Sequence, residues 1–160
     1  MTELKLRLDG EWPVDSLYFI SILVDLSNLQ NLSFRSHFEQ TIVSNIIDYF
    51  TVLLHHTSNL TSLVVLPLNT DGQYNTTMRA LCVMVPIRMK HFTVKIRKLD
   101  DMKIVIEGLK HLSSVSFHFP SDRKINSNEM IDWLLNNGRD FTHLEYEYSL
   151  HLWFGQNFQQ

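Results

Sequence analysis

The sequence has a single cysteine and shows no export signal. Cys82 has no second cysteine with which it could form an internal disulfide. The first residues, MTELKLRLDG, lack the basic start and the apolar run of a secretory signal. Both absences favour a reducing compartment, so we expect a cytoplasmic location, with the nucleus as the alternative.

The sequence also lacks a basic excess and a long apolar run. Its 14 Lys and Arg residues are outnumbered by 17 Asp and Glu residues, whereas a nucleic-acid-binding domain normally carries an excess of positive charge. The longest apolar run, from Leu17 to Leu26, is interrupted by Ser21 and Asp25 and is far shorter than the ~20 residues of a membrane span. We therefore expect neither a nucleic acid nor a membrane as partner.

Motifs of the common enzyme classes are missing as well. There is no Gly-x-Ser-x-Gly elbow and no His-Glu-x-x-His pair, and five glycines leave little material for a phosphate-binding loop. Cys82 lies on an apolar helical stripe, which is typical of a core residue rather than of a nucleophile. We expect no enzymatic activity and no cofactor.

The eight histidines do not form a convincing metal site. His55 and His56 are adjacent, and adjacent side chains on a helix point about 100° apart, which is poor geometry for a shared metal. His91 and His143 hold the same position in two copies of a repeat, but the copy between them has Ser114 there. Because neighbouring strands lie ~4.8 Å apart, these two rings would be too distant to share an ion.

What the sequence does contain is a recurring triplet of apolar residues. SNLQNLSFRS, from Ser27, and SNLTSLVVLP, from Ser58, share the pattern apolar, two others, apolar, one other, apolar. Each triplet ends in the strict alternation of a short strand with one buried face. A shortened copy, LKLRL, comes first, and the full copies begin at Leu29, Leu60, Met89, Leu112 and Phe141.

Between these strands the apolar spacing changes to that of helices. Residues three or four apart form one stripe in each intervening segment, which predicts five helices that alternate with six strands. The stripes are Leu17, Ile20 and Val24; Val43, Ile46, Ile47, Phe50, Leu53 and Leu54; Met78, Leu81, Cys82 and Val85; Leu99, Met102, Ile106 and Leu109; and Met130, Trp133 and Leu134.

A strand and a helix of this length can bury their apolar faces only by stacking on a neighbouring copy. The full copies of the triplet begin 23 to 31 residues apart. With this triplet and this spacing the chain resembles the leucine-rich-repeat family, in its longer, helix-containing class. The resemblance implies an α/β fold: a right-handed solenoid with about six parallel strands on the concave face and helices on the convex face, in one domain over residues 1–160. The Asn or Cys that normally follows the strand in this family is missing here.

Irregular repeats that begin SNL or KHL, with YSLHLWFGQ after the last strand, look most like the repeat region of F-box proteins. That resemblance implies substrate recognition for a ubiquitin ligase. The F-box that would bind the ligase adaptor is missing from the sequence, so the adaptor is an expected partner only through such a missing segment.

On an arc of this kind, the residues between the anchors point onto the inner face of the sheet. We expect this face to bind a protein or peptide without catalysis; the alternative is a structural fragment of a longer solenoid, and polar residues there could simply keep the sheet soluble. Arg7, Arg35, Lys95 and His118 predict a basic row that is broken by Leu66 and ended by Glu147. The predicted partner-binding residues are Lys5, Arg7, Arg35, His91, Lys95, His118, His143, Glu145 and Glu147.

Aromatic residues are concentrated at the C-terminal end of the sequence and allow two interpretations. They could cap the open end of the core, or they could form an interface. The alternation from Leu144 to Phe154 predicts one long strand packed on a single face, so we favour the cap.

Overall fold

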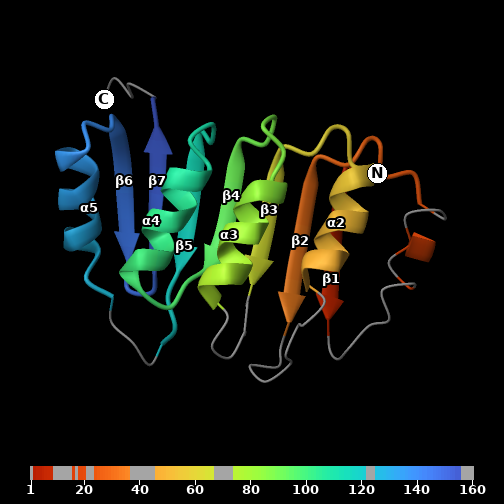
Figure 1. The fold of residues 1–160 in the computed structure, drawn as a ribbon, viewed down its shortest axis with the longest axis horizontal. Helices are drawn as coiled ribbons and strands as arrows, with labels where there is room; N and C mark the ends of the chain where they lie inside the picture. Colours follow the sequence, from red (N-terminus) through yellow and green to blue (C-terminus); the bar gives the residue numbers. More distant parts are fainter. Residues whose placement is uncertain are drawn as a thin grey trace.

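The computed structural model describes residues 2–8, 16, 18–20, 24–36, 46–66, 74–121 and 125–155. They form an α/β structure in which helices cover one face of a seven-stranded sheet (Figure 1). The elements are β1 (Glu3–Leu8), β2 (Asn31–Ser36), α2 (Ile46–His56), β3 (Ser62–Leu66), α3 (Tyr74–Met84), β4 (His91–Lys95), α4 (Leu99–Gly108), β5 (Ser114–His118), α5 (Ser127–Asn136), β6 (Phe141–Tyr146) and β7 (Ser149–Phe154).

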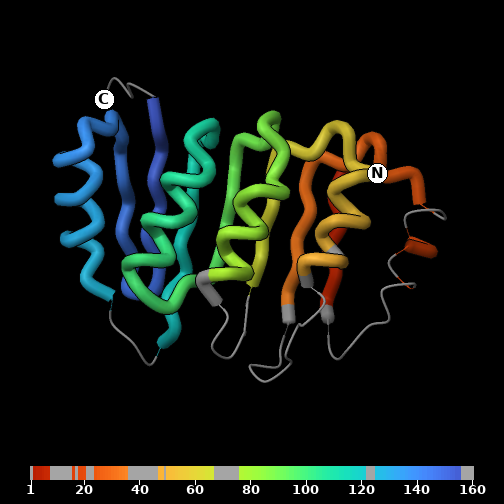
Figure 2. Tube along the Cα trace, in the orientation of Figure 1, coloured from red at the N-terminus to blue at the C-terminus, as the bar shows by residue number. Residues whose placement is uncertain are grey.

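The sheet is parallel from β1 to β5 and antiparallel at its end. Strands β1 to β5 pair in chain order, whereas β7 pairs with β5 and leaves β6 at the edge. Figure 2 follows the chain from β5 through α5 to β6 and back along β7, which lies between β5 and β6. Five of the six predicted strands are therefore parallel neighbours, whereas the sixth, β6, runs in the same direction but is separated from β5 by β7.

The predicted triplets form the core in four of their five full copies. The strand register places Leu32 beside Leu63, Leu63 beside Phe92, and Phe92 beside Val115. Each residue thus covers the apolar side of its neighbour, so the core continues from one repeat to the next. All twelve side chains are buried: Leu29, Leu32, Phe34, Leu60, Leu63, Val65, Met89, Phe92, Val94, Leu112, Val115 and Phe117.

Helices α2 to α5 bury most of the stripe residues that the sequence predicts, while Ile47, Leu99 and Trp133 are partly buried. Burial of one such aliphatic or aromatic side chain stabilises the fold by roughly 1.5–3 kcal/mol. Val43 and Leu17, which were also expected on helical stripes, lie outside the described residues. The buried helical residues include Phe50, Leu53 and Leu54 of α2, Met78, Leu81 and Cys82 of α3, Met102, Val105 and Ile106 of α4, and Met130 and Leu134 of α5.

One backbone carbonyl in each repeat joins that repeat to the next. The Thr2 carbonyl accepts hydrogen bonds from the amides of Gln30 and Asn31, both at 3.0 Å. The same pair of bonds recurs at the carbonyls of Gln30, Thr61 and Lys90, each of which accepts from two successive amides of the following repeat. Since a carbonyl oxygen has two lone pairs, each one is fully used, and the register of adjacent strands is fixed where they begin.

Side chains of later repeats satisfy carbonyls at the ends of earlier helices and turns. Asn59 Nδ2 donates to the Ser27 carbonyl at 2.7 Å, and Arg139 Nη2 donates to the Ile106 carbonyl at 3.3 Å. Arg88 donates in the same way to the Thr57 carbonyl. These hydrogen bonds join each donor to an earlier segment of the chain. The donors do not recur at a fixed position of the repeat.

Single residues shape the helix ends. Gly138 has φ 63° and provides a left-handed residue after α5, a conformation that glycine adopts readily. Asp101 accepts hydrogen bonds from the amides of Arg97 and Lys98, both at 3.0 Å, as expected of a carboxylate at a helix start. At the start of α5, the N-cap residue Asn126 makes no capping hydrogen bond through its side chain.

The last copy of the triplet does not enter the core in the predicted way. Phe141 is half-buried, but Leu144 and Tyr146 are 46% and 57% exposed. A two-residue turn at Glu147 and Tyr148 starts a hairpin, and Leu150 and Leu152 of β7 enter the core instead. The predicted long strand from Leu144 to Phe154 is therefore wrong. Even-numbered residues face away from the helices before the turn and toward them after it, which a simple alternation cannot reveal.

Because β7 and not β6 contributes leucines to the core, we expect different losses of stability from two leucines of the hairpin. Leu152→Ala should lower the free energy of unfolding by about 2–4 kcal/mol, because it leaves a cavity in the core. Leu144→Ala should cost less than about 1 kcal/mol, because that side chain is largely exposed. Urea denaturation of both variants measures the difference. A larger loss for Leu144→Ala would show that β6, not β7, completes the core.

Candidate functional site

The candidate site is the sheet face opposite helices α2 to α5, which we call the open face. Alternate residues of every strand point to it, and the register arranges them in three rows across the sheet. The first row is Glu3, Asn31, Ser62, His91, Ser114, Trp153 and Thr142. The second is Lys5, Ser33, Val64, Thr93, Ser116, His151 and Leu144. The third is Arg7, Arg35, Leu66, Lys95, His118, Ser149 and Tyr146.

The third row contains the basic residues in the predicted order. Arg7 lies directly beside Arg35, and Lys95 lies directly beside His118. A shallow cavity of about 280 Å³ at the β1 end is lined by Lys5, Leu6, Arg7 and Arg35. Positive charge therefore surrounds a hollow at this end of the row.

The two other predicted cationic or titratable positions on this face also lie where expected. Lys5 is exposed and forms an ion pair with Glu3 at 3.1 Å. His91 is exposed, and its Nδ1 lies 2.8 Å from the Ser114 hydroxyl of the neighbouring strand. Six of the nine predicted partner-binding residues, from Lys5 to His118, are thus brought together on the open face.

The charge of the row comes from arginine and lysine rather than from histidine. Burial lowers the pKa of His118, and the positive charges of His151, Arg35 and Lys95 lower it further. The imidazole of His118 is therefore less often protonated than an ordinary histidine at the same pH.

A cluster around His151 adjoins the row and was missed by the sequence analysis. The two ring nitrogens of His151 lie 2.7 Å from the Ser116 hydroxyl and 3.2 Å from the Ser149 hydroxyl. The ring stacks on Trp153 with the centroids 6.2 Å apart and meets the edge of Tyr146 at 5.6 Å. Burial also lowers the pKa of His151. The ring is fixed from four sides, so the cluster presents a preformed aromatic surface.

Three predicted partner-binding residues do not lie on the open face. His143 and Glu145 point toward the helix side of β6, and Glu147 lies in the turn before β7. Glu145 accepts a hydrogen bond from the Ser127 hydroxyl at the start of α5, and the His143 ring lies 6.0 Å from that of Phe141. The expected acidic end of the open face is wrong, because the row continues through Ser149 of the intervening strand β7 and ends at Tyr146 of β6.

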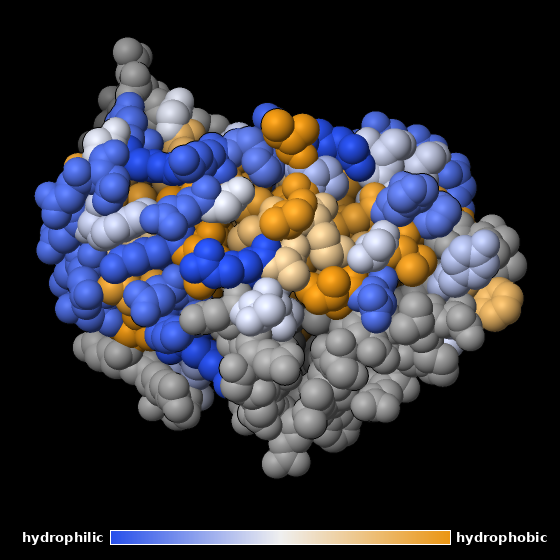
Figure 3. Space-filling view, in the orientation of Figure 1, coloured by the Kyte–Doolittle hydropathy of each residue, from blue (hydrophilic) through white to orange (hydrophobic). Residues whose placement is uncertain are grey.

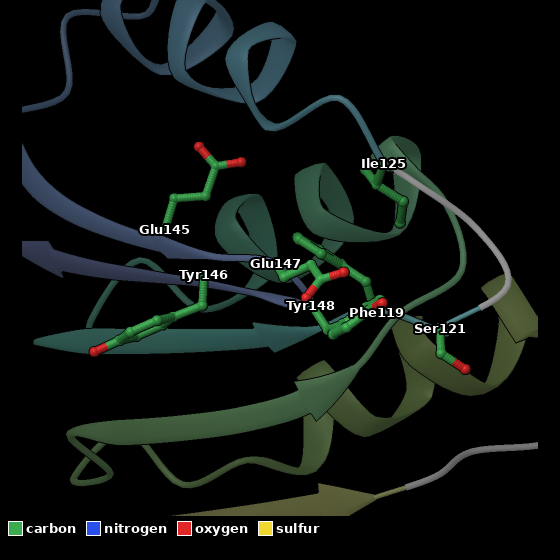
Figure 4. Close-up of a pocket in the computed structure, with 7 residues that line it drawn as sticks. All are labelled: Phe119, Ser121, Ile125, Glu145, Tyr146, Glu147 and Tyr148. Atoms are coloured by element: carbon green, nitrogen blue, oxygen red, sulfur yellow. The ribbon is translucent and has the colours of Figure 1, made fainter.

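The acidic residues gather at a separate cavity beside the β6–β7 turn. This cavity has a volume of about 460 Å³ and is lined by Phe119, Ser121, Ile125, Glu145, Tyr146, Glu147 and Tyr148. Figure 4 shows Glu145 directed toward α5 and Tyr146 directed to the opposite side of the strand. A hydrogen bond with Glu147 raises the pKa of the Tyr148 hydroxyl. This cavity lies at the rim of the sheet and not on the open face.

Two reactive side chains, Cys82 and His151, differ in their surroundings. Cys82 is buried between helices, and burial raises the pKa of its thiol to about 11, so that the nucleophilic thiolate is scarce near neutral pH. Both ring nitrogens of His151 lie within hydrogen-bond distance of serine hydroxyls, those of Ser116 and Ser149. Among the described residues, no group of three His, Cys, Asp or Glu side chains could hold a metal ion.

The helix side also carries exposed apolar residues. Figure 3 shows apolar atoms gathered near the middle of this side, over α3. Val83 is 87% exposed and Ile87 is 81% exposed. In the part of the chain that the structure describes, no helix is long and apolar enough to cross a membrane.

Comparison with family models, with curated proteins and with solved structures found no match for the chain.

The electrostatic link between Arg35 and His118 can be tested directly. Arg35→Gln should raise the pKa of His118, because it removes one of the positive charges that disfavour the imidazolium form. The pKa can be followed by NMR titration of the imidazole protons. Arg79→Gln, which removes an exposed cation from α3, should leave it unchanged. An equal change in the pKa of His118 in both variants would contradict an electrostatic effect of Arg35 on His118.

Proposed function

We propose that the protein is a non-catalytic recognition module of the leucine-rich-repeat type that binds an extended protein segment on its open face. The observation that supports this most strongly is the pairing of a basic row with an aromatic cluster on one surface. The basic row begins at the Arg7 and Arg35 hollow, and the cluster is centred on His151.

Solubility alone does not account for this surface. Polar side chains would keep an exposed sheet soluble, but Trp153, Leu144 and Tyr146 add apolar area to the same face. Tyr and Trp, together with Arg, are the residues that most often dominate binding energy at interfaces. Their position outside the core favours a partner as the reason for their presence.

The distance between Arg35 of the basic row and the His151 cluster indicates the kind of partner. Four strand intervals separate β2 from β7, which amounts to about 19 Å at ~4.8 Å per interval. An extended segment of roughly six residues spans that distance at ~3.3 Å per residue. We infer a segment with acidic groups at the Arg35 end and an aromatic or aliphatic residue at the His151 end.

The resemblance to the repeats of F-box proteins extends the proposal to ubiquitin ligation. The bound segment would then belong to a protein that is presented to a ligase, with the adaptor bound through an F-box outside this sequence. Affinity capture from the native cell tests this extension, and recovery of the adaptor with the protein supports it. Capture of the segment's parent protein without any adaptor would limit the function to recognition.

Selection from a phage-displayed library of random peptides tests the recognition proposal. The enriched peptides should carry an acidic end and an aromatic or aliphatic residue about six positions away. Charge reversal in Arg35→Glu/Lys95→Glu should weaken their binding by roughly tenfold or more, whereas Arg79→Glu should have little effect.

Two results of the selection would contradict the proposal. One is no enrichment at all. The other is a set of peptides whose binding survives the double reversal but is lost in Val83→Ser/Ile87→Ser, since that result would move the interface to the helix side.

A further inference from the structure

The outer edge of β6 carries backbone groups that do not face β7. The Gly155 amide donates to the Asp140 carbonyl at 3.3 Å, and the register continues this pattern at the even-numbered residues of β6. Backbone groups point to alternate sides along a strand, so the amides and carbonyls of Phe141, His143 and Glu145 point away from β7. The described residues form no further strand on that side. These groups are therefore placed to pair with a strand of another molecule.

Strand β6 also lacks several features by which proteins keep an edge strand from pairing. Such features include lysine, proline, a β-bulge and a covering helix or loop. The sequence of the strand, FTHLEY, contains neither lysine nor proline, and its six residues pair with β7 without a bulge. Every residue from Thr142 to Tyr146 is exposed, so the strand is not covered.

Helix α5 carries an apolar flank at the same end of the fold (Figure 1). Leu134 is buried in the core, and Trp133 faces α4, since Lys103 of that helix lies over its ring at 5.9 Å. Because successive helical residues are turned by about 100°, Ile131 and Leu135 lie on the flank away from α4. Leu135 is 61% exposed and Ile131 is half-buried. Helix α5 ends the row of helices in Figure 1, so no described helix lies on that flank.

A second copy of the chain has a strand that fits this edge. In an antiparallel pair with its two-fold axis at Leu144, His143 lies opposite Glu145 of the second copy, and the same pair recurs on the other side of the axis. The outward backbone groups of both residues then face each other, so each of the two pairs exchanges two hydrogen bonds. On the open face, Leu144 meets its own counterpart at the axis, and Tyr146 lies opposite Thr142.

Charge favours a second copy over an arbitrary strand. A charged side chain such as that of Glu145 discourages most strands from pairing at an edge. In the two-fold arrangement, an imidazole N–H of His143 can donate to this carboxylate, twice by symmetry. Glu145 already accepts a hydrogen bond from Ser127, but a carboxylate has two oxygens and can accept both. The side chain that would repel other strands is thus matched in a second copy.

We propose that the protein forms a two-fold symmetric dimer in which two β6 strands pair antiparallel and join two sheets into one. Both helix layers lie on the same side of the joined sheet, so the two α5 flanks face each other and cover Ile131 and Leu135. The two open faces form one continuous surface. This dimer does not depend on what the open face binds.

Disulfide trapping of the full chain tests the position of the axis. Leu144→Cys should form a covalent dimer on oxidation, because directly opposite residues of an antiparallel pair lie about 4.5–5.5 Å apart at Cα, within the range of a disulfide. Thr142→Cys is the matched control and should not cross-link, because the two copies of this residue lie roughly 14 Å apart along the strands. Cys82 is buried and is present in both variants.

Charge variants test the complementarity, with sedimentation velocity as the measurement. His143→Glu places two carboxylates opposite each other and should weaken dimerisation by roughly tenfold or more. Glu145→His removes the acceptor and should also weaken it. An equal mixture of these two variants places a carboxylate opposite an imidazole in both pairs and should restore the dimer as a heterodimer. Circular dichroism should show the native fold in each variant, because both positions are exposed.

Several results would overturn the dimer. One is a monomer at a protein concentration of roughly 100 µM, since weaker association does not indicate a specific interface. Another is equal cross-linking by Leu144→Cys and Thr142→Cys. A dimer that survives His143→Glu but is lost in Val83→Ser/Ile87→Ser would place the interface on α3 instead. Species larger than a dimer would indicate open head-to-tail pairing of β6 with another edge.

Discussion

The in-register stacking of buried side chains on neighbouring strands determines the rest of the structure. Leu32, Leu63, Phe92 and Val115 lie side by side because each repeat begins at a carbonyl that holds two amides of the next repeat. A shift of one residue in any strand would move its buried set to the opposite face. Packing of the core therefore determines which residues of each strand lie on the open face.

Much of this arrangement could be predicted from the sequence, because it depends on local periodicity. The triplets predict the five parallel strands, the helical stripes predict α2 to α5, and the alternation predicts the basic row from Arg7 to His118. The triplets recur every 23 to 31 residues along the chain, and their internal spacing can be recognised without knowledge of distant contacts. The identity of the hydrogen-bond donors between repeats, such as Asn59 and Arg88, has no such period and could not be predicted.

The end of the chain could not be predicted for a specific physical reason. Leu144, Tyr146, Tyr148, Leu150, Leu152 and Phe154 alternate without interruption, and the turn at Glu147 and Tyr148 contains neither glycine nor proline. The hairpin reverses which parity faces the helices, so His143 and Glu145 leave the open face while His151 and Trp153 enter it. Leu150 and Leu152 close the core, whereas His151, Trp153 and Tyr146 lie on the open face.

The position of β7 between β5 and β6 determines both which residues close the core and which residues lie on the open face. NMR contacts between backbone protons test this position most directly. The account predicts nuclear Overhauser effects that pair Val115 with Leu152 and Phe117 with Leu150, in an antiparallel pattern. Contacts that pair Val115 and Phe117 with Leu144 and Tyr146 in a parallel pattern would contradict it. Such contacts would return the acidic residues to the open face and remove the aromatic cluster from it.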